Sequence, residues 1–217
     1  MHGSSGGPLT PAAPWVILGL PSGGEGEPML LTLTGGSGAG KTTLAAALTA
    51  TAPCDSVRVL HADDYYFRTP DSGVWFLDEN GVPHLDFGDP RSLDIARLAL
   101  DTEAALASHA VAIVDGLFAC RVVPQVACAR FHVFVDLPAD LRLVRKIQRK
   151  CLRDGFPLDV LLRNYLRHRR DAHDRHVEPA RHDCDLELDG TLPAETLARQ
   201  VWSVVLARGL AGVRQSS

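Results

Sequence analysis

The sequence has no hydrophobic run approaching the ~20 residues that a helix needs to cross a bilayer. Its N-terminus has neither the basic start nor the long apolar core of a signal peptide. Charge of one sign is not in large excess, because the formal net charge is only -4. We therefore expect no membrane partner and no nucleic-acid partner.

Cysteine is scarce and scattered. The five cysteines form no C-x-x-C pair, and an odd number without framework spacing is typical of reduced thiols. This pattern predicts a cytoplasmic location. The cysteines are Cys54, Cys120, Cys128, Cys151 and Cys184.

The length of 217 residues predicts one domain with a core of useful size. Residues 1–28 are rich in Gly, Pro and Ser and are interrupted by the apolar run Trp15–Leu18, so we expect a flexible N-terminal arm. Residues 29–217 are expected to form a single domain.

A glycine-rich turn lies between an apolar segment and a helix-forming one. Residues 35–42 match G-x-x-x-x-G-K-[ST], the P-loop pattern, in which glycines let backbone N–H groups point at a phosphate. The helix that follows directs its positive dipole end at the same anion. A plain Gly/Ser turn is the alternative. The residues expected to bind nucleotide are Gly35, Gly36, Ser37, Gly38, Ala39, Gly40, Lys41, Thr42 and Thr43.

Short apolar segments alternate with amphipathic ones along the chain. This order predicts an α/β fold with three layers: a five-stranded parallel sheet and helices on both faces. In such sheets ligands bind beyond the carboxyl ends of the strands. Between the second strand and the next helix, residues 69–89 are long and turn-rich, which is typical of a functional connection. The expected strands are 30–34, 57–61, 111–114, 131–135 and 186–188.

Carboxylates follow two of these strands. Asp115 ends an apolar run and resembles the Walker B acid that contacts Mg²⁺; the alternative is a turn-forming Asp before a Gly. Asp63 is our candidate for the base that accepts a hydroxyl proton during phosphoryl transfer, with Asp64 as the fallback. Both could instead only cap a turn. Tyr65 is a candidate to stack on a flat substrate, or it packs the loop.

The region 142–176 is strongly basic. Steps of three and four residues place its first cations on one helical face, which predicts a lid that closes over nucleotide phosphates. Binding to a nucleic-acid backbone and a solvated basic face are the other interpretations. We select Arg145 and Arg149 for phosphate contacts and expect the remaining cations to face solvent.

Together these motifs resemble the uridine kinase and phosphoribulokinase-like group of P-loop kinases, which includes nicotinamide riboside kinases and type I pantothenate kinases. The likeness covers about residues 30–190 and is best at 35–43, 62–66, 114–118 and 131–185. It implies a P-loop NTPase fold, ATP and Mg²⁺ as cofactors, and transfer of the γ-phosphate of ATP to a hydroxyl of a small molecule, most simply a nucleoside or other riboside.

The resemblance also implies roles for single residues. Asp63 matches the catalytic base, Lys41 the phosphate-binding lysine and Arg149 a lid arginine. Thr42 and Asp115 match the Mg²⁺ site. Asp86 resembles the carboxylate that holds ribose hydroxyls in nicotinamide riboside kinases, with Asp89 second.

The sequence departs from the pattern of these kinases at positions that would recognise the acceptor substrate. Only a short linker precedes Val111, so the pyrimidine-reading hairpin of uridine kinases is missing. Leu85 replaces a stacking aromatic, and Asp154 and Phe156 replace lid arginines. A kinase for a non-nucleoside alcohol (pantothenate, a sugar acid or a natural product) is therefore the alternative. A nucleotide switch or ATPase is disfavoured because N-K-x-D and L-S-G-G-Q motifs are absent. The choice between ATP and GTP and the formation of a homo-oligomer stay open.

Overall fold

The structure is a computed structural model, and it describes residues 27–78 and 81–209. The predicted N-terminal arm lies outside the described residues, apart from its last two positions. Among the described residues no helix combines the length and apolar character that a membrane span requires.

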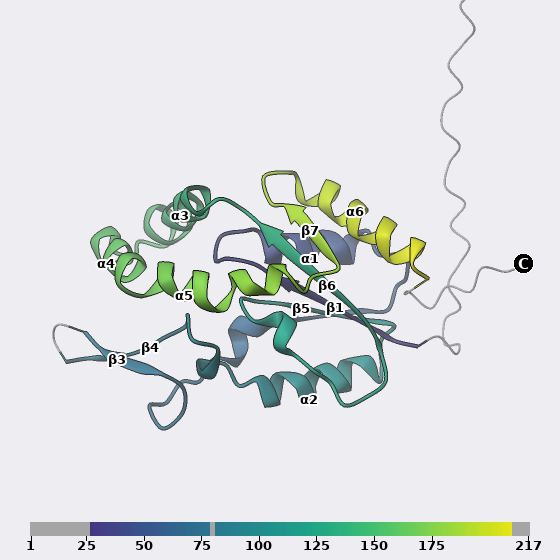
Figure 1. Cartoon of the computed structure of the whole chain (residues 1–217), viewed down its shortest axis with the longest axis horizontal. Coiled ribbons are helices and arrows are strands. Elements are labelled where there is room, and N and C mark those ends of the chain that lie inside the picture. The colour runs from purple at the N-terminus through teal and green to yellow at the C-terminus, as the bar shows by residue number, and fades with distance from the viewer. Residues whose placement is uncertain (1–26, 79–80, 210–217) are drawn as a thin grey trace, which may run out of the picture.

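Five parallel strands form the central sheet (Figure 1). Their spatial order is β2-β5-β1-β6-β7, so β1, which leads into the P-loop, is the central strand. All six residues of β1 are buried, as expected for a strand covered on both faces. The predicted parallel sheet is confirmed. The strands are β1 (Met29–Thr34), β2 (Val57–His61), β5 (Val111–Asp115), β6 (Ala129–Asp136) and β7 (Leu186–Asp189).

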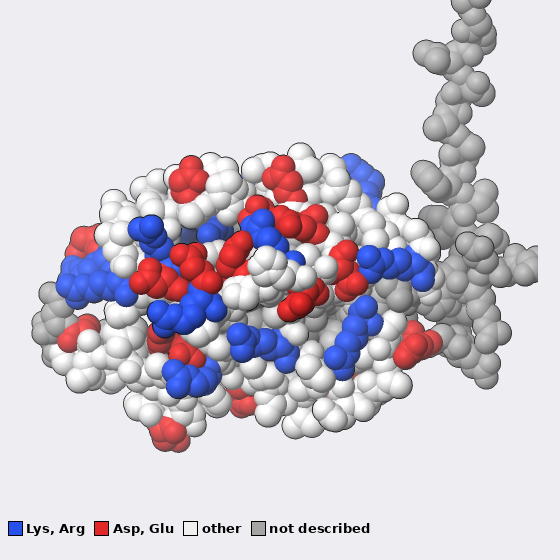
Figure 2. All heavy atoms as spheres, viewed as in Figure 1, with Lys and Arg blue, Asp and Glu red and all other residues white. Residues whose placement is uncertain are grey.

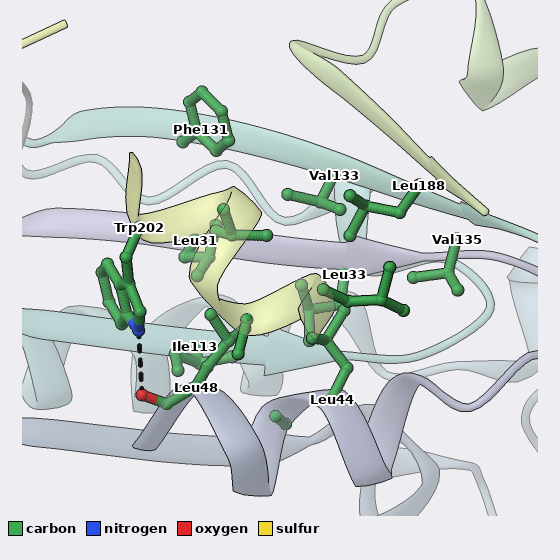
Figure 3. Packing of buried hydrophobic residues seen from close by; sticks show 14 of the residues in the cluster. Leu31, Leu33, Leu44, Leu48, Ile113, Phe131, Val133, Val135, Leu188 and Trp202 are labelled. Carbon is green, nitrogen blue, oxygen red and sulfur yellow. Dashed lines mark hydrogen bonds between the residues drawn. The ribbon is translucent and has the colours of Figure 1, made fainter. Parts of the chain in front are cut away.

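Helices cover both faces of the sheet, which confirms the predicted three layers. Helices α1 (Lys41–Ala50) and α6 (Ala194–Ala207) pack on one face, and α2 (Ile95–Leu106) packs on the other. The first core contains Leu31, Leu44 and Trp202 (Figure 3). The indole Nε1 of Trp202 donates to the carbonyl of Leu48 over 3.1 Å. Because that carbonyl lies in the last turn of α1, the bond satisfies an acceptor that the helix itself leaves open.

The basic region is helical as predicted. It consists of α3 (Ala139–Ile147), α4 (Leu158–Asn164) and α5 (Arg170–His176), which project beyond the sheet (Figure 1). Two π-helical stretches, Gln148–Arg153 and Tyr165–Arg169, interrupt the α-helical pattern. Such stretches are rare in proteins overall, and those that occur often lie at functional sites.

The long connection after β2 contains an antiparallel hairpin that the sequence analysis did not predict. Strands β3 (Trp75–Leu77) and β4 (Pro83–Leu85) pair with Trp75 opposite Leu85. Each strand has three residues, which is too short for an alternating pattern to be recognised. The hairpin lies beside α5 on the lid side of the molecule (Figure 1).

Candidate active site

A cavity of about 930 Å³ opens at the carboxyl ends of β1, β2 and β5. The P-loop with the start of α1, residues 37–44, forms its floor, and the lid forms the opposite wall. The cavity is large enough for a nucleotide and a small acceptor, since ligand sites commonly measure about 300–1,000 Å³. The crevice therefore lies where the parallel sheet predicts it.

The P-loop backbone lies so close to its neighbours that glycine is required at two positions. A Cβ on Gly35 would lie 2.4 Å from the carbonyl oxygen of Val135, and one on Gly38 would lie 2.7 Å from the carbonyl oxygen of Arg142. Gly38 also has φ of 91°, in the left-handed region that favours glycine. The start of α3 thus packs directly against the loop. The glycine-rich loop leads into the N-terminus of α1, whose free N–H groups and positive dipole end favour an anion.

Lys41 is buried under the loop. Its Nζ donates to the carbonyls of Gly35, at 2.9 Å, and Gly36, at 3.0 Å. Burial lowers the pKa of Lys41 to about 8, while the carboxylates of Asp63 and Asp115 raise it in opposition. A lysine desolvated in this way gains by pairing with a phosphate, which fits its predicted role.

Thr42 and Asp115 meet at the start of α1. The Thr42 hydroxyl donates to Oδ2 of Asp115 over 2.6 Å, and His61 Nδ1 lies 2.6 Å from Oδ1 of the same carboxylate. The register pairs His61 with Asp115 at the ends of β2 and β5. His61 was not predicted as a site residue, although its place at a strand end was a signal. A hydroxyl and a single carboxylate are the hard oxygen donors that Mg²⁺ takes together with substrate phosphates and waters.

Asp63 stands in the 3₁₀ turn Ala62–Tyr65 that follows β2, and it lines the cavity. It shares this cavity with Lys41 of the P-loop, Tyr66 and Lys146 of the lid. Gly116 allows this arrangement, because a Cβ there would lie 2.5 Å from that of Ala62. Asp64 also lines the cavity.

The lid brings cations to the cavity from α3 and the π-helical stretch after it. Arg145 and Arg149 both line the cavity, and Nη2 of Arg145 donates to the carbonyl of Gly190 over 3.1 Å. Arg142 and Lys146 line it as well and are less exposed than either. The prediction that the remaining cations face solvent is therefore wrong for these two.

Lys146 of the lid has a lowered pKa. Burial is the main reason that its pKa falls to about 8, and the neighbouring charges of Arg169, Arg149 and Lys150 lower the pKa further. The carboxylate of Asp63 opposes this effect and raises the pKa. The crowding of cations indicates a site that is completed by an anionic ligand.

Other lid cations form ion pairs. Arg163 pairs with Asp159 at 2.9 Å, and Arg153 pairs with Asp154. Outside the lid, Arg181 contacts Asp136, Glu178 and Glu187. Figure 2 shows acidic and basic side chains interspersed on the face that it displays. This mixture differs from the basic stripe typical of nucleic-acid binding.

Aromatic side chains line the end of the cavity away from the P-loop. Tyr66 and Phe87 meet edge to face with centroids 4.9 Å apart, and the Tyr66 hydroxyl donates to the carbonyl of Phe87. Tyr65 is not part of this wall: it is buried, and its hydroxyl donates to Asp101 over 2.7 Å. Tyr65, predicted as a substrate residue, therefore does not line the cavity, whereas its neighbour Tyr66 does.

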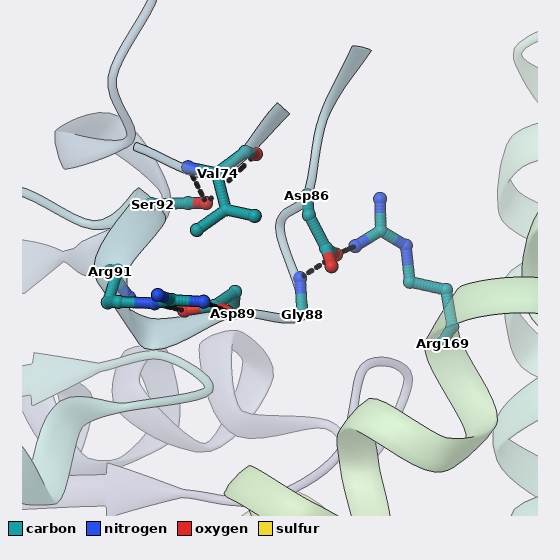
Figure 4. Close-up of polar contacts among 7 residues, drawn as sticks. All are labelled: Val74, Asp86, Gly88, Asp89, Arg91, Ser92 and Arg169. Carbon is teal, nitrogen blue, oxygen red and sulfur yellow. Dashed lines mark hydrogen bonds and ion pairs between the residues drawn. The ribbon is translucent and has the colours of Figure 1, made fainter. Parts of the chain in front are cut away.

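Asp86 lies beside this wall, since Phe87 and Gly88 line the cavity. Arg169 donates to Asp86 over 2.8 Å. Asp89 points elsewhere, to the backbone and guanidinium of Arg91 (Figure 4). Of the two carboxylates considered for the acceptor, only Asp86 is tied to a cavity residue.

Two small-molecule kinases of solved structure share this architecture. A shikimate kinase from Acinetobacter baumannii in complex with shikimate is similar with a TM-score of 0.52 and 18% identity, over 85% of this chain and 96% of that chain. A gluconokinase from Sinorhizobium meliloti 1021 gives 0.51 and 17%, over 86% and 95%. These likenesses show the P-loop NTPase fold.

Sequence comparisons identify the family within the P-loop NTPase fold. The model of the phosphoribulokinase / uridine kinase family matches residues 76–196, more than half of the chain. A uridine kinase from Deinococcus deserti is 28% identical over 184 residues, 75% of this chain and 88% of that protein. One from Staphylococcus aureus strain JH9 is 29% identical over 179 residues, 72% and 85%. The chain belongs to the phosphoribulokinase / uridine kinase family and is a small-molecule kinase.

Proposed function

We propose that this kinase transfers the γ-phosphate of ATP to a hydroxyl of a nucleoside or another riboside, with Mg²⁺ as cofactor. The observation that carries the proposal is that Asp63 lines the same cavity as Lys41 of the P-loop and Lys146 of the lid. A carboxylate that shares a cavity with phosphate-binding cations can accept the proton of an acceptor hydroxyl.

Each residue then has a role. Lys41 and the loop N–H groups bind the terminal phosphates, and Arg145, Lys146 and Arg149 neutralise charge on the transferring group from the lid side. Asp63 accepts the hydroxyl proton. Closure of the lid excludes water, which would otherwise compete as acceptor.

Thr42 and Asp115 would hold the Mg²⁺. The metal supplies charge neutralisation for the phosphate oxygens. His61 fixes the other oxygen of Asp115 and so orients the carboxylate.

At the acceptor end, Tyr66 and Phe87 offer an aromatic wall. Asp86, which precedes Phe87 and is bonded to the cavity residue Arg169, offers a carboxylate for vicinal hydroxyls. Identities of 28% and 29% to uridine kinases support a nucleoside. One observation favours the second candidate, a kinase for a non-nucleoside alcohol: only residues 107–110 join α2 to β5, which leaves no pyrimidine-reading hairpin there.

The free thiols of the five cysteines support a cytoplasmic location, which we also propose.

The test is a screen of ATP consumption with uridine, cytidine, nicotinamide riboside, pantothenate and sugar acids. We expect a nucleoside or other riboside to stimulate turnover most, and the phosphorylated product to be identified by mass. Stimulation by pantothenate or a sugar acid alone would select the second candidate. No stimulation by any of these alcohols would contradict the proposal.

A further inference from the structure

The lid holds the acceptor-side loop through one ion pair. Nη1 of Arg169, at the end of the second π-helical stretch, donates to Oδ1 of Asp86 over 2.8 Å (Figure 4). The backbone N–H of Gly88 donates to the same Oδ1 over 2.9 Å. Neither bond uses Oδ2. Asp86 is thus fixed by one oxygen, while its second oxygen is not needed to hold it.

The pair is protected from water. The Asp86 and Arg169 side chains are only 22% and 21% exposed. The guanidinium also lies 5.5 Å from the ring centroid of Phe87. A half-buried, charge-assisted bond of this kind defines geometry more firmly than an exposed surface pair.

The backbones of the two segments also approach closely. A Cβ on Gly88 would lie 2.7 Å from the Cβ of Ala172 in α5. Farther along the hairpin, the Phe76 ring stacks on His168 with centroids 4.2 Å apart. Contacts therefore run from the hairpin to the acceptor-side loop, and all of them end on the segment 168–172.

We propose that Arg169 is a positioning residue that sets acceptor affinity: it holds Asp86, and with it Phe87, in the conformation that receives the acceptor hydroxyls. This inference rests on the proposed function. It assigns the second half of the lid to the acceptor, whereas the α3 side of the lid serves ATP. The lid therefore contacts both substrates, and its position is coupled to acceptor binding.

The variant R169M removes the charge-assisted bond and keeps much of the side-chain length. With the best acceptor from the screen, we expect R169M to raise the acceptor KM about tenfold or more, because a hydrogen bond to a charged group is lost. The KM for ATP should change less than about twofold. R169K should recover part of the loss.

Two further variants separate positioning from general damage. R163M removes a lid arginine that pairs with Asp159 on α4, and it should leave both KM values unchanged. The double variant D86N/R169M should be little worse than D86N alone, because Arg169 acts only through Asp86, which itself receives the acceptor hydroxyls. Additive losses, or equal increases in the two KM values, would overturn the inference.

Hydrogen exchange gives a readout that needs no acceptor. In R169M the amides of Phe87 and Gly88 should exchange faster than in the wild type, while the P-loop amides should exchange at the wild-type rate. In the control R163M the amides of Phe87 and Gly88 should also exchange at the wild-type rate. Unchanged exchange at these amides in R169M would overturn the inference. If the wild type used no acceptor, the proposed function would be refuted. The exchange result would then still test whether Arg169 holds Asp86 and Phe87 in place.

Discussion

The Thr42 hydroxyl donates to Oδ2 of Asp115 over 2.6 Å and joins the start of α1 to the end of β5. These residues are 73 positions apart in the chain. Their contact fixes a hydroxyl and a carboxylate at the point where nucleotide phosphates would arrive.

Asp115→Asn should weaken the binding of Mg²⁺. The amide keeps the shape but removes the charge that attracts the cation, so we expect the Mg²⁺ concentration for half-maximal turnover to rise about 10- to 100-fold. Measurement of ATP turnover against Mg²⁺ checks this. His61→Ala should shift the same curve by less, since it only orients the carboxylate. An unchanged Mg²⁺ dependence in Asp115→Asn would refute the assignment.

Asp63→Asn should separate binding from turnover. The amide cannot accept the proton of the acceptor hydroxyl, so kcat should fall about 10²- to 10⁴-fold. ATP affinity, measured by calorimetry, should stay within a few-fold. The same change at Asp64 should cost much less, and the opposite order would make Asp64 the base.

Lys146 should give the activity a pH dependence. Its pKa of about 8 means that the ammonium is present below pH 8 and is lost as the pH rises above it. The pH dependence of kcat/KM reports the ionisations of the free enzyme. We therefore expect kcat/KM for ATP to decline as the pH rises above 8, because a charge that attracts the phosphates disappears. K146R keeps its charge, so its decline should be shallower. Identical alkaline limbs in the two proteins would show that Lys146 does not contribute.

Trp202 should dominate the stability of the α1–α6 layer. Trp202→Ala removes a buried ring, 4% exposed, and should lower the free energy of unfolding by about 3–5 kcal/mol. Trp202→Phe keeps most of the apolar contact but leaves the Leu48 carbonyl without its donor, which should cost about 1–3 kcal/mol. Urea denaturation measures both. Equal losses in the two variants would assign the effect to the hydrogen bond alone.

Local patterns in the sequence were sufficient for the sheet and the phosphate end of the site. A P-loop combines a contiguous motif with a buried strand, so Lys41 and Thr42 could be assigned directly. Asp115 followed from the rule that ligands gather at strand ends. The structure places all three together.

The acceptor end depends on contacts between distant segments, and a single sequence does not show these. The hairpin strands are too short to give a period. Tyr65 and Tyr66 are adjacent and chemically alike, so only the 3₁₀ turn decides which one faces the cavity. Arg169 looked like one cation among many, because its partner Asp86 is 83 positions away.

Arg142 sets a mechanical limit on the lid. Its Nε donates to the carbonyl of Leu137 over 2.9 Å, and its own carbonyl lies against Gly38. The first turn of α3 is thereby fastened to the phosphate loop and moves with the core. We therefore expect lid opening to pivot beyond residue 142, with α4 travelling farther than the anchored first turn of α3.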